Sequence, residues 1–122
     1  MSPSVRHVIA WVLQAALALL FIKAGFDKLS NLDGTMKMFG SMGLPSWFGG
    51  FIGGAELPGG IGLLVPRTVR LAAQGLLVIM AGAVMMHATV LPGGMAKGGP
   101  ALVFLLLLLA LLWLRRPAPL VA

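Results

Sequence analysis

Hydrophobic residues along this chain fall into four long runs, which polar or glycine- and proline-rich stretches separate. Because a helix rises ~1.5 Å per residue, about 17–25 apolar residues span the core of a bilayer. The fourth run is the shortest. The pattern predicts a single all-α domain over residues 1–122, a polytopic membrane four-helix bundle. The predicted spans are residues 8–29, 47–65, 68–90 and 99–114.

The longest connection between runs, residues 30–46, carries signals for a further short helix and a turn. Ser30 and Asn31 are residue types that cap helix N-termini, so a short helix in the membrane interface is expected after them. Residues 43–45 (G-L-P) then predict a turn before the second span. Pro66 ends the second run just before the third begins, so these two spans should form an antiparallel pair.

Composition agrees with a membrane protein. The chain is 59% hydrophobic and 10% charged, and its mean hydropathy is +1.00. The formal net charge of +6 comes from cations between apolar runs, which is typical of membrane-interface anchors rather than of a nucleic-acid-binding face. Cysteine is absent from the sequence, so thiol chemistry and Fe–S clusters are excluded within this chain. The expected partners are the lipid bilayer and a protein subunit or second copy of the chain, with no nucleic acid.

The distribution of arginines predicts the orientation. With four spans, both termini and the turn at residue 66 share one side of the membrane. That side carries five arginines and no acidic residue, so we expect both termini in the cytoplasm. The arginines are Arg6, Arg67, Arg70, Arg115 and Arg116.

Glu56 is the only ionisable residue of the second run and lies at its centre. A charged group at the bilayer centre costs roughly 2.5–3.5 kcal/mol, so it is expected to face the interior of the bundle. Gly53 and Gly60 lie one turn to either side and allow close helix approach, and Pro58 is expected to kink the helix. Two interpretations stay open: a ligand- or proton-handling carboxyl, and a structural residue bonded to a neighbouring helix.

Few polar residues can reach Glu56. We expect the carboxyl to be either protonated at neutral pH or paired with a lysine of the first span. Lys23 lies roughly 7–8 Å outward from the middle of that span, and Lys28 about one turn farther. Gln14 and Gln74 would extend a polar spine across the bundle if they face Glu56, or else form ordinary interhelical hydrogen bonds.

A soft-metal site is a separate hypothesis. Thioether and imidazole ligands suit Cu(I), and the predicted topology places Met85, Met86, His87 and Met95 on the non-cytoplasmic side. Methionine is also a flexible apolar filler of membrane helices. With two histidines and three acidic residues in the chain, no zinc site is expected.

Several short motifs resemble those of the DoxX family of small bacterial membrane proteins. They are residues 24–29 (A-G-F-D-K-L), 43–45 (G-L-P), 54–60 (G-A-E-L-P-G-G) and 65–73 (V-P-R-T-V-R-L-A-A). The resemblance implies a four-helix bundle in the bacterial inner membrane and association with membrane redox systems, since a related subunit belongs to a thiosulfate:quinone oxidoreductase. Lys28 and Glu56 match the family's recurring lysine and glutamate.

The resulting functional hypothesis is a membrane subunit or accessory of a respiratory or redox complex, with a quinone-size pocket beside Glu56. We expect no cofactor that is intrinsic to the chain. A quinone is the one candidate for a bound cofactor. A non-catalytic subunit is favoured over an autonomous enzyme. Two alternatives stay open, a membrane protein that handles a small molecule or Cu(I), and a structural anchor for a partner enzyme.

Overall fold

The computed structural model describes residues 2–89 and 98–117, and in these ranges all regular secondary structure is helical. The helices, in chain order, are α1 (Pro3–Ser30), α2 (Leu32–Ser41), α3 (Trp47–Leu63), α4 (Val69–Thr89) and α6 (Gly99–Leu114). The all-α prediction is therefore confirmed for the described residues. The end of the third predicted span at residue 90 lies outside them.

The number of helices differs from the predicted four, because the described ranges contain five. The additional helix is α2, which follows α1 after one residue. Asn31 separates the two helices, and its side-chain oxygen accepts a hydrogen bond of 3.3 Å from the backbone N–H of Gly34. This cap begins the short helix expected in the connection. Pro58 lies inside α3, which runs unbroken from Trp47 to Leu63, and the kink there stays a prediction.

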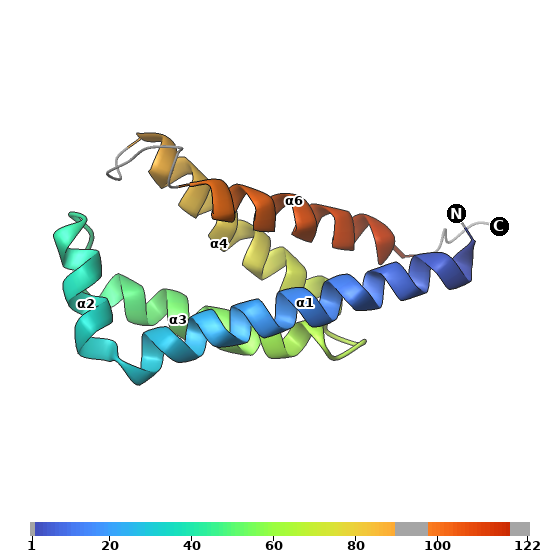
Figure 1. Cartoon of the computed structure of the whole chain (residues 1–122), viewed down its shortest axis with the longest axis horizontal. Coiled ribbons are helices and arrows are strands. Elements are labelled where there is room, and N and C mark those ends of the chain that lie inside the picture. Colours follow the sequence, from blue (N-terminus) through green and yellow to red (C-terminus); the bar gives the residue numbers. More distant parts are fainter. Residues whose placement is uncertain (1, 90–97, 118–122) are drawn as a thin grey trace.

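The helices form two pairs (Figure 1). α1 packs along α3, with α2 at its end, and α4 packs along α6. α3 also contacts α4, and α1 contacts α6, so the pairs meet near the chain termini and diverge toward α2. The core where they meet is built from fully buried leucines, among them Leu17, Leu63, Leu76, Leu108 and Leu111.

Glycines set the spacing between α1 and α3. A Cβ atom on Gly25 of α1 would lie 2.6 Å from the backbone N of Leu57 and 2.8 Å from the carbonyl oxygen of Gly53. On α3, a Cβ on Gly60 would lie 2.9 Å from the backbone N of Ile22. Such distances are shorter than real Cβ contacts, so only glycine permits this crossing. The close approach brings the end of α1 against the middle of α3.

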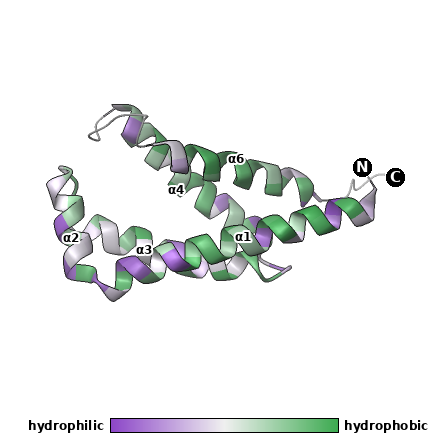
Figure 2. Cartoon of the chain, viewed as in Figure 1, coloured by the Kyte–Doolittle hydropathy of each residue, from purple (hydrophilic) through white to green (hydrophobic). Residues whose placement is uncertain are grey.

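Within residues 2–89 and 98–117, two helices are long and apolar enough to cross a membrane. They are α1, with 28 residues, and α4, with 21 residues, and α6 is a shorter apolar helix. Figure 2 shows α6 and most of α4 as hydrophobic, whereas hydrophilic residues gather around α2 and the adjoining end of α1. Large apolar side chains such as Leu19, Leu71 and Val78 point outward. An apolar outer surface of this extent is typical of contact with lipid.

Candidate functional site

An ion pair joins α1 to α3 just beyond their glycine crossing. Lys28 Nζ donates a hydrogen bond of 2.8 Å to Glu56 Oε1. The side chain of Glu56 is 5% exposed and that of Lys28 is 22% exposed. The packing of Gly53 explains the contact, since a Cβ there would lie 2.8 Å from the Cβ of Lys28. The acidic residue at the centre of the second apolar run thus lies in the interior with a lysine partner.

Lys23, the other lysine considered as a partner of Glu56, lies elsewhere. Its Nζ contacts Asp27 Oδ2 at 2.6 Å, one turn along the same helix. The side chains of this second pair are 74% and 56% exposed. An exposed pair at i, i+4 contributes little to stability. The described residues therefore contain one partly buried and one exposed lysine–carboxylate pair, whose lysines lie on neighbouring turns of α1.

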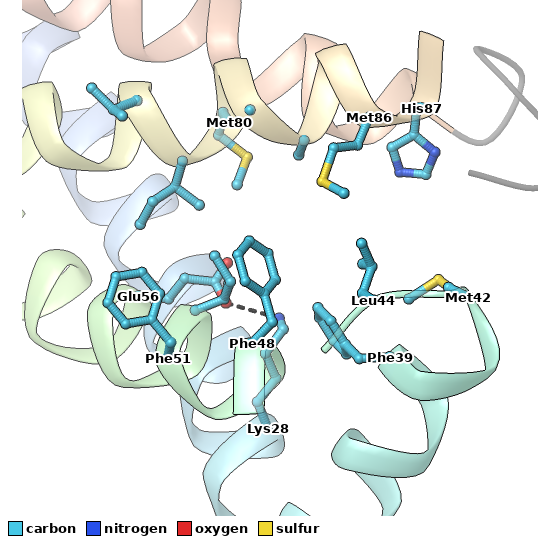
Figure 3. A pocket seen from close by; sticks show the side chains of 15 residues that line it. Lys28, Phe39, Met42, Leu44, Phe48, Phe51, Glu56, Met80, Met86 and His87 are labelled. Carbon is cyan, nitrogen blue, oxygen red and sulfur yellow. Dashed lines mark hydrogen bonds and ion pairs between the residues drawn. The ribbon is translucent and has the colours of Figure 1, made fainter. Parts of the chain in front are cut away.

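The Lys28–Glu56 pair lines a cavity of about 390 Å³ between α4 and the α2–α3 layer. Figure 3 shows α4 on one side, carrying Met80, Met86 and His87, and the ion pair on the other. The remaining wall is mainly aromatic and aliphatic. It includes Phe39, Met42, Leu44, Phe48 and Phe51. We call this space the larger cavity.

A second cavity, of about 260 Å³, lies between α1, α4 and α6. Apart from the residues that it shares with the larger cavity, its walls are entirely apolar. They include Leu20, Phe21, Ala24, Ala101 and Phe104. We call this space the smaller cavity.

His87 is a candidate copper ligand in the sequence. The structure places it on the walls of both cavities, with Lys28 and Glu56. Its Nδ1 atom is buried and has no hydrogen-bond partner among the described residues. Gly98 packs against the ring, because a Cβ at Gly98 would lie 2.8 Å from His87 Cβ. The imidazole therefore adds a hydrogen-bonding group to the same space as the ion pair.

The two predicted glutamines do not join this site. Gln14 is 1% exposed. Its Nε2 donates to the carbonyl oxygen of Leu63 at 2.8 Å, and its Oε1 accepts from Arg115 Nε at 2.7 Å. It lines a separate small cavity with His7 and Arg115. Gln74 is exposed on α4. Gln14 therefore acts as an interhelical hydrogen-bonding residue, and Gln74 takes no part in a spine across the bundle.

The methionines proposed for Cu(I) are dispersed. Met85 is 67% exposed on α4, whereas Met86 and His87 line the larger cavity. Met95 lies outside the described residues. Among residues 2–89 and 98–117, no three His, Cys, Asp or Glu side chains cluster as a metal site would require.

The fold and the site define a class: an apolar helical protein in which a partly buried lysine–glutamate pair borders an apolar cavity. The sequence model of the DoxX family matches residues 9–89, which is more than half of the chain. The chain belongs to the DoxX family. The family and the two long apolar helices indicate a membrane protein.

A curated relative carries a redox name. The chain is 29% identical over 73 residues to the "Putative oxidoreductase CatD" of Bacillus subtilis (strain 168). The match covers 60% of this chain and 54% of the relative, so the chain spans about half of that protein's length. No solved structure matches the chain.

Proposed function

We propose that this protein is an integral membrane subunit or accessory of a redox complex, and that it holds a quinone-size molecule in the larger cavity. The observation that carries the proposal is the Lys28–Glu56 pair on the wall of that cavity. A space of about 390 Å³ falls within the usual range of ligand pockets, roughly 300–1,000 Å³. Such pockets combine apolar walls with a few polar groups that orient the ligand, and this one has three, Lys28, Glu56 and His87.

The polar groups match the needs of a quinone. The ammonium of Lys28 can donate a hydrogen bond to a quinone carbonyl oxygen, and the carboxyl of Glu56 can exchange a proton with it. Reduction of a quinone to a quinol takes up two electrons and two protons. The protons would pass through the polar wall, and the electrons would come from a partner protein. The chain is therefore proposed as a non-catalytic subunit, and the redox name of its relative supports this assignment.

The retention of quinone by the purified protein tests the proposal. Protein isolated from bacterial membranes in mild detergent should contain quinone in its lipid extract, measured by mass spectrometry per mole of protein. Glu56→Gln keeps the shape of the side chain but removes its charge and its proton. Hydrogen bonds to charged groups contribute about 1.5–3 kcal/mol, so retention should fall roughly tenfold or more.

Lys23→Met is the matched control for this experiment, because Lys23 belongs to the exposed pair on the same helix. It should retain as much quinone as the unaltered protein. Absence of quinone from the unaltered protein, or equal amounts in Glu56→Gln, would contradict the proposal and favour a structural anchor. The same preparation identifies any protein that co-purifies, or shows a second copy of the chain.

We further propose that the chain is a multi-pass protein of the bacterial inner membrane with both termini in the cytoplasm. Arg70 Nη1 donates to the carbonyl oxygen of Arg115 at 3.1 Å, so two of the arginines lie at one end of the bundle. Arginine-rich ends of membrane helices usually face the cytoplasm.

Labelling of introduced cysteines tests this topology, and the chain has no native cysteine to interfere. Cysteines replacing Ser4 and Ser41, which are both exposed, should react from opposite sides of the membrane with an impermeant maleimide. Only the Ser41 position should react in intact spheroplasts. Reaction of both positions from the same side would contradict the topology.

A further inference from the structure

The larger and smaller cavities share part of their walls. Lys28, Glu56, Met80 and His87 line both of them, and we call these four residues the junction. The two cavities are therefore neighbours, one on each side of the ion pair. Met80 is the only member of the junction without a polar head, and its unbranched thioether side chain has three rotatable bonds. A flexible side chain at this position can adjust its shape to a ligand that contacts both cavities.

The two cavities differ in what they can accommodate. The larger one has aromatic walls at Phe39, Phe48 and Phe51, suited to the faces of a flat ring. The smaller one is about two-thirds of that volume, and beyond the junction it offers only apolar side chains from α1 and α6. An apolar space beside a polar junction suits a hydrocarbon chain rather than a second polar group.

We infer that the ligand is a ring-headed membrane lipid whose polar ring lies in the larger cavity and whose hydrocarbon chain extends through the smaller cavity between α1 and α6. This inference rests on the proposed function and adds the class of ligand. It distinguishes a lipid-soluble quinone from a water-soluble ring without a chain. The junction then contacts the ring where the chain is attached, so that Lys28, Glu56 and His87 lie beside the oxygen atoms of the ring.

Two probes with the same ring test the inference, a dimethoxy-methyl-benzoquinone without a chain and its decyl derivative. Ala101 lines the smaller cavity only, Ala83 lines the larger cavity only, and the exposed Ala110 of α6 lines neither. Each is replaced by Phe in the full chain. Binding of the radiolabelled probes to immobilised, detergent-purified protein gives a Kd for each probe, and thermal unfolding checks that each variant is folded.

Ala101→Phe should weaken binding of the decyl probe about tenfold, because the phenylalanine ring occupies the space that the hydrocarbon chain needs. The same variant should leave the Kd of the chainless probe unchanged. Ala24→Phe, on the α1 wall of the same cavity, should do the same. Ala83→Phe should weaken both probes, and Ala110→Phe neither. Because the chainless probe reports an intact ring site in the same variant, a folding defect cannot imitate this result.

The failures of the two proposals are distinguishable. If neither probe binds the unaltered protein, the proposed function fails, and the inference fails with it. If both probes bind Ala101→Phe and Ala24→Phe as well as the unaltered protein, the ligand site stands but the chain does not lie in the smaller cavity. If these variants lose both probes equally, the assignment of ring and chain to separate cavities is wrong.

Discussion

Lys28→Met should lower the free energy of unfolding by roughly 3 kcal/mol or more, because it removes the ion-pair partner of a buried carboxylate. The side chain of Glu56 is 5% exposed, and its described ion-pair partner is Lys28 at 2.8 Å. Methionine fills a similar volume without the charge, so the loss measures the unpaired carboxylate rather than an empty space. Thermal and chemical unfolding in detergent, followed by circular dichroism, give the difference.

Two further variants complete this test. Lys23→Met breaks the exposed pair five residues away and should cost only a few tenths of a kcal/mol. The double variant Lys28→Met/Glu56→Gln removes both charges and should recover part of the stability lost in Lys28→Met, since neighbouring residues are not additive. Equal stability of Lys28→Met and Lys23→Met would show that the buried pair does not hold α1 to α3.

Gly25→Ala should produce the second large effect, because the added methyl group meets backbone atoms that cannot turn away. Its Cβ would lie 2.6 Å from the N of Leu57 and 2.8 Å from the O of Gly53, so α1 and α3 must separate. Overpacking of this kind costs about 1–3 kcal/mol. The separation also draws Lys28 away from Glu56, so quinone retention should fall together with stability. Both quantities are measured on the same detergent-purified protein.

Gly54→Ala is the control for this substitution. Gly54 is adjacent in sequence to a glycine of the crossing, but a Cβ there has no heavy atom within 4 Å. In a helix interior, alanine is favoured over glycine by about 0.8–1 kcal/mol, so Gly54→Ala should be neutral or slightly stabilising. If Gly25→Ala is as stable as Gly54→Ala, the close crossing is not a determinant of the fold.

Helix positions could be predicted from the sequence because they depend on local features. The apolar runs mark α1, α3, α4 and α6, and Asn31 marks the start of α2. The burial of Glu56 could be expected from the cost of an ionised group among apolar residues. The short helix was expected as part of the connection between the first two spans. It forms a regular helix of ten residues, α2, so the described ranges contain five helices.

The identity of the partner of Glu56 could not be derived from distances along a helix. That measure favoured Lys23, whereas the structure pairs Glu56 with Lys28. The difference arises from the crossing of α1 and α3, because the contact at Gly25 sets how far one helix is displaced along the other. The motif match pointed to Lys28 through the family resemblance, without a physical reason.

The cavities and the role of His87 depend on how helices distant in sequence diverge. Apolar periodicity shows which face of a helix is buried, but not where two packed layers separate. His87 near the end of α4 and Glu56 at the middle of α3 lie 31 positions apart in the sequence. Only their common position on the walls of both cavities brings them into one site. Gln74 illustrates the reverse case, because a polar residue within an apolar run faces outward.

The two lysine–carboxylate pairs of α1 should respond differently to ionic strength. At physiological salt the Debye length is ≈ 8 Å, so counterions screen charges in water but act much less on buried ones. The Lys23–Asp27 pair faces outward and is subject to that screening, whereas the Lys28–Glu56 pair is largely withdrawn from the surrounding ions. The charge pattern on the wall of the larger cavity is therefore set by helix packing, and it should stay constant when the electrolyte around the protein is diluted or concentrated.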